Sequence, residues 1–176
     1  MSSNKEFIIP FEGLKNGKHS FEFNITTEFF EELAYSIIQG GDVKVDFQLN
    51  KKDTMLIGDI EMSGTVQKSC DRCTDIMDIP LEVSHQIIYK FGEEESVDEN
   101  LIVLPVSAFT IDIASTLYEL LTVALPGRTV HEEDECNEEM LDLIDKYVDS
   151  SESYEDESDD DEEDTDPRWD ALKNLN

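Results

Sequence analysis

An α+β fold is predicted for this chain, with a mainly antiparallel sheet, two or three packed helices and an acidic, disordered C-terminal segment. Several segments alternate apolar and polar residues, which is typical of half-buried strands. Others place apolar residues three and four positions apart, which is typical of amphipathic helices. Carboxylates dominate the C-terminal part. A length of 176 residues suits one domain with an appendage.

The first clear strand is predicted from His19 to Ile25, because Phe21, Phe23 and Ile25 share one face. A helix is expected next, with Thr26 or Thr27 as its N-cap. Its apolar stripe is Phe29, Phe30, Leu33, Ile37 and Ile38, and Gly40-Gly41 would end it.

A hairpin is predicted after this helix. In its first arm Val43, Val45, Phe47 and Leu49 alternate with polar residues, and 50–53 supplies the turn. The return arm runs from Met55 to Val66, with Gly58 and Gly64 as expected bulges. A further extended segment, Ile76 to Tyr89, follows, so Cys70 and Cys73 are predicted to lie in a turn between two strands.

Two helices are predicted in the second half of the chain. The first spans Asp112 to Leu125, with Asp112 as N-cap and an apolar face of Ile113, Leu117, Leu120, Leu121 and Ala124. The second begins at Asn137 and has a weaker apolar face. The short apolar segment Leu101–Val106 precedes both.

The charge is concentrated in one segment. The formal net charge is −30, and between Glu132 and Asp166 twenty acidic residues stand against one basic residue, Lys146. Such a segment contains too little apolar area to offset the entropy cost of ordering. We therefore predict a globular domain over 1–148, an acidic disordered linker over 149–165 and a short docking helix over 166–176, capped by Asp166 with Pro167 at its first position.

This charge restricts the class of partner. A polyanion repels phosphates, so nucleic-acid binding through the acidic segment is not expected. A basic protein surface would be attracted instead, and the charge can also serve solubility alone. Both interpretations stay open at this point.

Several functional classes find no support in the sequence. It has no secretory signal pattern and no apolar run of about 20 residues, so a cytoplasmic location without membrane contact is expected. No nucleophile elbow, phosphate-binding loop, dinucleotide fingerprint or HExxH pattern is present either. We therefore expect no enzyme.

The motif Cys70-Asp71-Arg72-Cys73 is the clearest chemical signal. Two thiols at this spacing supply half of a tetrahedral metal site, and a closed site needs four ligands. His131 and Cys136 would complete three thiolates and one imidazole if their loop reached this turn. Free structural thiols and a redox pair are the alternatives, although neighbouring acids and a hairpin context disfavour a reactive dithiol.

The three arginines of the chain, Arg72, Arg128 and Arg168, each stand in a distinctive local context. A guanidinium can bind a carboxylate or a phosphate through its planar fork. Because carboxylates are abundant here, salt bridges or partner contacts are favoured over RNA contact.

Taken together, the Cys70–Cys73 motif, the helix from Asp112, the region of His131 and Cys136, and Asp166-Pro167-Arg168-Trp169 resemble the bacterial YceD-like family of large ribosomal RNA subunit accumulation proteins. The resemblance implies a non-enzymatic cytoplasmic factor that supports synthesis, processing or stability of large-subunit (23S) ribosomal RNA. It also implies association with a small basic ribosomal protein of that subunit.

One departure from the family concerns the metal. Some members carry extra cysteines near the position of Cys136, whereas this chain has one, so no cofactor is required by the resemblance and zinc stays open. The expected partner is a basic large-subunit ribosomal protein or a pre-ribosomal particle. The candidate partner-binding residues are Cys70, Arg72, Cys73, Arg128, Asp166, Pro167, Arg168 and Trp169.

Two other functions stay open from the sequence. The chain would bind ribosomal RNA directly if Lys68, Arg72 and Arg128 formed a cationic surface at the turn. It would act as a thiol- or zinc-dependent redox protein if Cys70 titrated near neutral pH. The oligomeric state cannot be predicted.

Overall fold

The computed structural model describes residues 5–93, 98, 100–132 and 135–148. Contacts between residues divide the chain into two units, Met1–Glu138 and Glu139–Asn176. The predicted acidic linker and docking helix, with Asp166, Pro167, Arg168 and Trp169, lie outside the described residues, so these predictions stand as they were.

Most strands come in the first two thirds of the described chain, and two of the three α-helices follow them. In chain order they are the 3-10 helix η1 (Lys5–Phe7), β1 (Ile8–Pro10), β2 (Gly17–Ile25), α1 (Thr27–Glu31), β3 (Gly40–Lys51), β4 (Met55–Ser69), β5 (Ile76–Phe91), β6 (Leu101–Leu104), β7 (Thr110–Asp112), α2 (Ala114–Ala124) and α3 (Glu138–Val148). Within the residues that the structure describes, every helix is too short or too polar to span a membrane.

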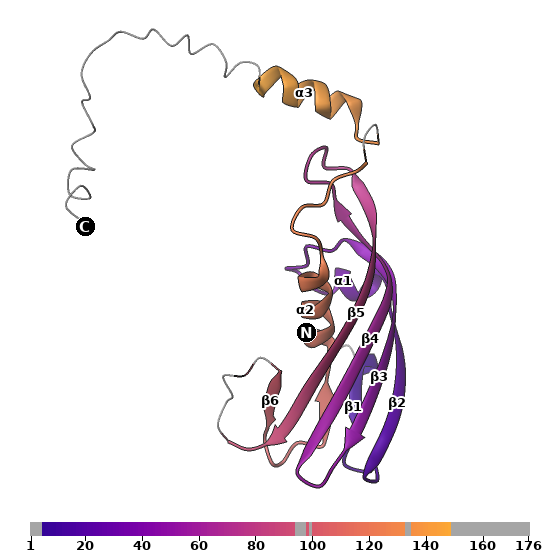
Figure 1. The fold of residues 1–176 in the computed structure, drawn as a ribbon, viewed down its shortest axis with the longest axis vertical. Helices are drawn as coiled ribbons and strands as arrows, with labels where there is room; N and C mark the ends of the chain where they lie inside the picture. The colour runs from indigo at the N-terminus through magenta and orange to yellow at the C-terminus, as the bar shows by residue number, and fades with distance from the viewer. Residues whose placement is uncertain (1–4, 94–97, 99, 133–134, 149–176) are drawn as a thin grey trace, which may run out of the picture. The chain divides into compact units, whose positions relative to one another are not determined.

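A five-stranded sheet in the order β2-β3-β4-β5-β6 forms most of the first unit (Figure 1). Strands β2 to β5 are antiparallel neighbours, whereas β6 pairs with the end of β5 in parallel. A second, two-stranded sheet joins β1 and β7. With three α-helices in the described chain, the predicted α+β class with a mostly antiparallel sheet is confirmed.

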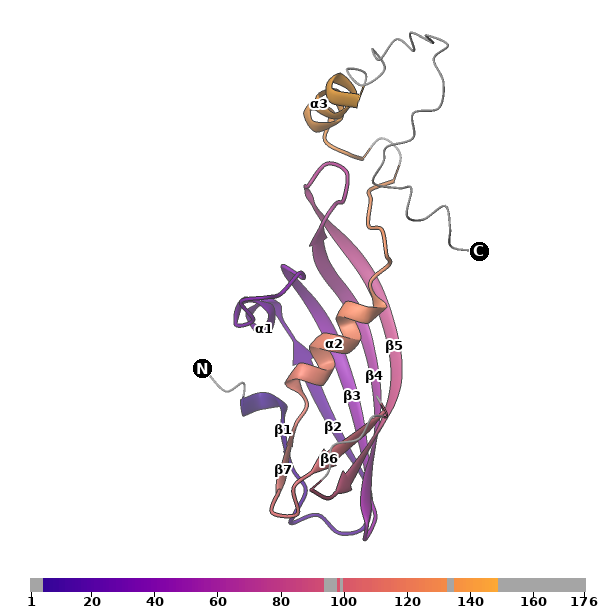
Figure 2. The same ribbon diagram turned by 90° about the vertical axis from the view of Figure 1, so that its left-hand side faces the viewer.

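The core lies on one face of the large sheet. In β3, Val43, Val45, Phe47 and Leu49 are all fully buried, as their alternation predicts. Helix α2 packs against β5 and lies across this face (Figure 2), where Leu117 and Leu121 are buried. The opposite face of β2 to β5 carries the alternate, mainly polar residues.

Helix α2 begins at Ala114, with Ile113 as its N-cap, one residue later than an N-cap at Asp112 predicts. Asp112 belongs to β7, and its carboxylate accepts a hydrogen bond from the backbone N–H of Ala114 at 3.0 Å. The side chain therefore still satisfies one of the free N–H groups of the first turn.

The helix predicted over the stripe from Phe29 to Ile38 is wrong in its length. Helix α1 ends at Glu31, and turns follow. The Ser36 hydroxyl donates to the carbonyl of Ile38 at 2.6 Å and accepts from its N–H at 3.2 Å, so it competes with helical backbone bonds. The N–H of Ile37 is satisfied by the Tyr118 hydroxyl instead.

The bulges expected at Gly58 and Gly64 are also wrong. Pairing with both neighbouring strands continues without interruption along β4. These glycines are explained by close packing, because a Cβ at Gly58 would lie 2.7 Å from the Phe47 ring and one at Gly64 would lie 2.2 Å from the carbonyl oxygen of Asp42.

Candidate metal centre and acidic sheet face

The hairpin turn between β4 and β5 carries two cysteines, as predicted. Residues 70–75 close this turn through backbone bonds from Cys70 N to Asp75 O at 2.8 Å and from Thr74 N to Cys70 O at 3.0 Å. Thr74 adopts a left-handed conformation with φ of 67°. The N–H of Arg72 points at the Cys70 sulfur, 3.4 Å away, and stabilises negative charge on it.

A second segment, which follows α2, lies against this turn. The backbone of Asp71 donates to the Thr129 carbonyl at 2.7 Å, and Thr129 donates its N–H to the Asp71 carboxylate at 2.7 Å. Further along, the Asn137 amide donates to the Asp75 carboxylate at 3.2 Å. The segment between Thr129 and Asn137 is thus attached to the turn at both ends.

These attachments bring all four metal-ligand candidates together. The Sγ atoms of Cys70 and Cys136 are 4.0 Å apart, and His131 Nδ1 lies 3.3 Å from Cys73 Sγ and 3.9 Å from Cys136 Sγ. All four ligand atoms lie within 4.8 Å of one another. The condition on which the sequence prediction depended, that the loop after α2 reaches the turn, is met.

The spacing fits a tetrahedral ion. Zinc bonds of about 2.3 Å to sulfur and about 2.0–2.1 Å to nitrogen place two sulfurs about 3.8 Å apart and a sulfur about 3.6 Å from a nitrogen. The three cysteines are buried and unpaired by disulfides, and His131 is half-buried. Three thiols and one imidazole form a set that suits zinc and fills all four of its positions.

Protonation within the cluster is uneven. Burial disfavours the charge of the Cys70 thiolate, but backbone N–H groups of Cys73, His131 and Arg72 outweigh burial and lower the Cys70 pKa to about 6. The Asn137 N–H lowers the pKa of Cys73. Burial and the neighbouring thiols raise the pKa of Cys136.

The imidazole of His131 responds in the opposite sense to its surroundings. Burial lowers the pKa of His131, but contacts with Cys73 and Cys70 outweigh burial and raise it. A metal would reverse this preference, because the ligating imidazole must be neutral and the thiols deprotonated.

Of the two predicted arginines in the described chain, one contacts the cluster and the other does not. Arg72 reaches into the cluster, with its guanidinium 3.9 Å from Cys136 Sγ. Arg128 is exposed, one residue before Thr129. The contact of Asp71 with Thr129 was not predicted, and it has no local sequence signal because the two residues are 58 positions apart.

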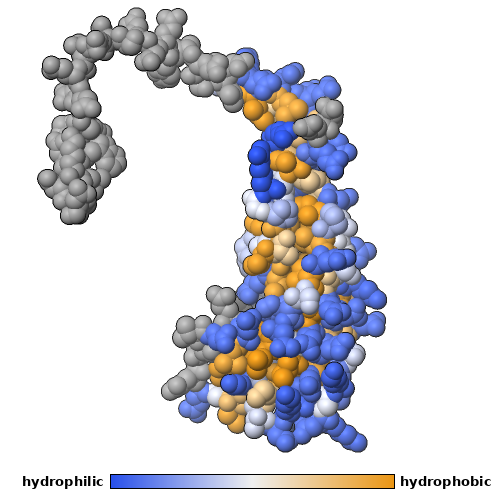
Figure 3. All heavy atoms as spheres, viewed as in Figure 1, coloured by the Kyte–Doolittle hydropathy of each residue, from blue (hydrophilic) through white to orange (hydrophobic). Residues whose placement is uncertain are grey.

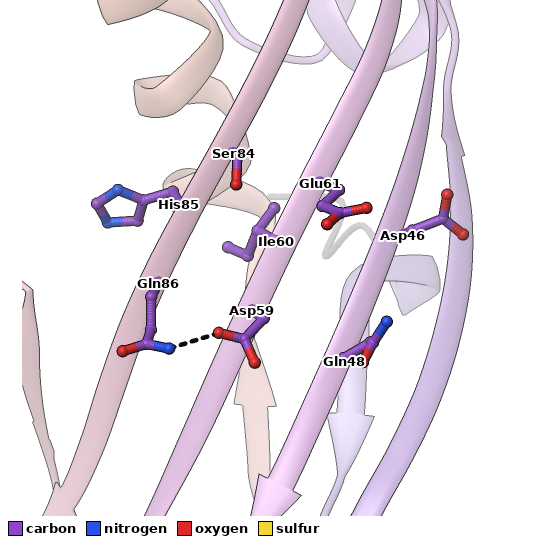
Figure 4. A pocket seen from close by; sticks show the side chains of 8 residues that line it. All are labelled: Asp46, Gln48, Asp59, Ile60, Glu61, Ser84, His85 and Gln86. Carbon is purple, nitrogen blue, oxygen red and sulfur yellow. Dashed lines mark hydrogen bonds between the residues drawn. The ribbon is translucent and has the colours of Figure 1, made fainter.

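The outer face of the large sheet forms a second candidate surface, which we call the acidic sheet face. Glu22, Asp46 and Glu61 stand directly opposite one another on β2, β3 and β4, and Ser84 on β5 continues the row. Asp59 lies beside this row and accepts a hydrogen bond from the Gln86 amide at 2.6 Å. A depression of about 370 Å³ follows these strands (Figure 4).

The charge of this face is largely uncompensated. Among the described residues, no lysine or arginine forms a salt bridge with Glu22, Asp46 or Glu61, and Lys68 pairs with Asp71 instead. Lys44, two residues from Asp46 on the same strand face, is the nearest cation along β3. Figure 3 shows hydrophilic residues along the strand side of the body and apolar residues in the middle of the same view.

The fold and the cluster define a class of α+β protein with a Cys₃His group able to hold a metal. The model of the YceD family, described as large ribosomal RNA subunit accumulation protein YceD, matches residues 58–176. The chain belongs to this family, as its motifs indicated. No curated protein and no solved structure matches the chain.

The match includes β4 from Gly58 onward, all of β5, α2 and α3, and the remainder of the chain. The description of the family links it to the accumulation of large-subunit ribosomal RNA. It names no partner, metal or reaction.

Proposed function

We propose that this chain supports the accumulation of large-subunit ribosomal RNA by binding a basic ribosomal protein of that subunit through the acidic sheet face. The observation that carries the proposal is the row of Glu22, Asp46 and Glu61, three carboxylates opposite one another on adjacent strands. The role in ribosomal RNA accumulation comes from the family.

Like charges directly opposite one another in a sheet are destabilising. A cationic partner would reduce this repulsion between carboxylates. Its binding would therefore be favoured by the removal of an interaction that destabilises the folded chain alone. The polar neighbours Gln48, Ser84 and Gln86 add donors and acceptors along the same depression. The acidic segment from Glu132 to Asp166 would further increase the rate of encounter with such a partner.

Direct binding of ribosomal RNA receives less support. Two of the three cations that this alternative invokes are engaged within the body: Lys68 pairs with Asp71 at 2.7 Å, and Arg72 contacts Cys136. Only exposed Arg128 remains of the three. A surface with this balance would lack the several phosphate contacts that such binding needs.

We also propose that the Cys₃His cluster holds a structural zinc ion and is not a redox site. A dithiol enzyme needs one reactive thiol pair, whereas here a third thiol and an imidazole converge on Cys70 and Cys73. Four protein ligands leave no position for substrate, so the ion would supply folding energy to the junction of the hairpin with the segment after α2.

Capture of large-subunit ribosomal proteins tests the proposed partner. The full chain is immobilised and exposed to a mixture of proteins extracted from large subunits, at low and at physiological salt. The triple variant Glu22→Gln, Asp46→Asn, Glu61→Gln should retain several-fold less basic protein than the native chain, because charge steering and complementarity are reduced.

The matched control is the triple variant Glu12→Gln, Glu31→Gln, Glu119→Gln, which removes the same charge from exposed positions off this face. It should capture basic proteins as the native chain does. Equal capture by both triple variants would contradict the proposed role of the acidic sheet face.

A further inference from the structure

We infer that Asp71 and Arg72, the two residues between the cysteines of the hairpin turn, are positioning residues that hold the other half of the metal-ligand set in place. The inference rests on the proposed zinc site and extends it, since these two residues are not ligands. Each reaches from the turn to the segment that carries His131 and Cys136.

Asp71 attaches the start of that segment. One carboxylate oxygen accepts both the Thr129 N–H at 2.7 Å and the Thr129 hydroxyl at 3.0 Å, and the backbone N–H of Asp71 donates to the Thr129 carbonyl. Thr129 is 2% exposed, which is unusual for a polar residue in a loop. Three bonds between two residues therefore fix the backbone two positions before His131.

Lys68 completes this contact. Its ammonium donates to the second carboxylate oxygen of Asp71 at 2.7 Å and to the Thr129 hydroxyl. The cation compensates the Asp71 charge, so the carboxylate does not add to the negative charge of the nearby thiolates. Asp71 thus positions the ligands indirectly, by fixing the backbone of the segment that carries them.

Arg72 attaches the far end of the ligand set. Its guanidinium lies 3.9 Å from Cys136 Sγ, and its backbone N–H lies 3.4 Å from Cys70 Sγ. Three thiolates around a divalent ion leave one net negative charge. A guanidinium beside one of these sulfurs compensates that charge and limits the positions that Cys136 can adopt.

These contacts have a consequence for metal binding. Cys70 and Cys136 are 66 positions apart. Bringing such distant segments together costs chain entropy. Because Asp71 and Arg72 already hold the two segments together, the metal binds to a formed site. The entropy cost of closing the loop therefore does not weaken metal binding.

The test measures the affinity of the purified full-length chain for zinc by competition with a chromogenic chelator. Asp71→Asn should bind zinc about 10- to 100-fold more weakly, the range typical of changes to residues outside the ligand set. The reason is that it weakens the attachment of the segment that carries His131 and Cys136. The matched control is Asp78→Asn, which removes an equal charge from β5, where Asp78 accepts a bond from Gln67 at 2.9 Å. It should bind as the native chain does.

Cobalt substitution separates positioning from ligation. At saturating cobalt, Asp71→Asn should keep the absorption of a tetrahedral site with three sulfurs and one nitrogen, because the four ligands remain. Arg72→Met should keep the same coordination but shift the sulfur-to-cobalt charge-transfer band, because a donor to Cys136 is lost. Arg72→Lys, which keeps the charge, should shift it less.

The outcomes distinguish the two proposals. If the native chain binds no stoichiometric zinc, the proposed metal site fails and this inference fails with it. If the native chain binds zinc and Asp71→Asn binds it as tightly as Asp78→Asn does, the site stands and the positioning role is overturned. Should Asp71→Asn not fold, Thr129→Val replaces it, because it removes the hydroxyl that donates to Asp71 and accepts from Lys68, and it should weaken zinc binding relative to Thr129→Ser.

Discussion

Tyr89 shows burial and polarity in conflict at a single residue. Its side chain is 1% exposed, and among the described residues no hydrogen-bond partner meets its hydroxyl. Burial raises the pKa of Tyr89 above its ordinary value. The hydroxyl thus costs stability at neutral pH, and ionisation of the phenol would cost more.

Tyr89→Phe should increase the free energy of unfolding by about 1 kcal/mol at pH 7, because it removes an unsatisfied buried hydroxyl. The sign of the pH dependence follows from the raised pKa. Below the unfolded pKa of about 10 the phenol is neutral in both states and the free energy of unfolding does not depend on its ionisation. As pH rises beyond that value the phenol ionises in the unfolded chain first, so the free energy of unfolding falls. Urea unfolding at pH 7 and an alkaline titration would measure both effects.

In this titration the phenylalanine variant should unfold at a higher pH than the native chain. A variant that is less stable at pH 7 by 1 kcal/mol or more would show that the hydroxyl has a partner beyond the described residues.

Residue types in the candidate site could be predicted from the sequence, but their contacts could not. The spacing of Cys70 and Cys73 indicates paired ligands, and His131 and Cys136 are the nearest residues of suitable type. The attachment through Asp71 and Thr129 depends on how α2 returns the chain to the hairpin. That path is a property of the tertiary fold, which local patterns do not encode.

At the scale of elements, β3 and β4 approach each other so closely around Gly64 that this position requires a residue without a Cβ. A Cβ there would lie 2.2 Å from the Asp42 carbonyl oxygen and 2.7 Å from Val43 Cα, and both atoms belong to the backbone. Backbone in the middle of a sheet cannot move aside as a flexible side chain can.

Gly64→Ala should therefore reduce the free energy of unfolding by about 1–3 kcal/mol, through overpacking. Thermal or urea unfolding measures the change. Gly13→Ala is the matched control, because a Cβ at Gly13 would meet nothing within 4 Å. Equal stability of the two variants would contradict the close packing of these strands.

Elements with strict alternation were predictable, and those shaped by distant contacts were not. The hairpin of β3 and β4 follows from its period of two and its polar turn, and the turn with both cysteines follows from the two strands around it. Helix α1 is shorter than its apolar stripe suggests because Ser36 and Tyr118 take backbone groups from residues after it. The parallel pairing of β6 with β5 has no local signal.

At the scale of the whole molecule, charge is arranged on one face of the sheet while the cations beside the cysteines serve internal contacts. The first unit has an apolar face covered by α2 and an acidic face without a salt-bridge partner in the described chain. This asymmetry is the physical basis for expecting a cationic partner. It also explains why naked ribosomal RNA would be a poor ligand.

The most direct test is a pair of binding titrations of the full chain at physiological ionic strength. The chain is titrated with basic large-subunit ribosomal proteins and, separately, with protein-free large-subunit ribosomal RNA, and binding is followed by fluorescence anisotropy. The account predicts saturable binding of a basic protein that weakens as salt rises, with no comparable binding of RNA. Tight binding of the RNA without any protein, and no binding of the basic proteins, would contradict it.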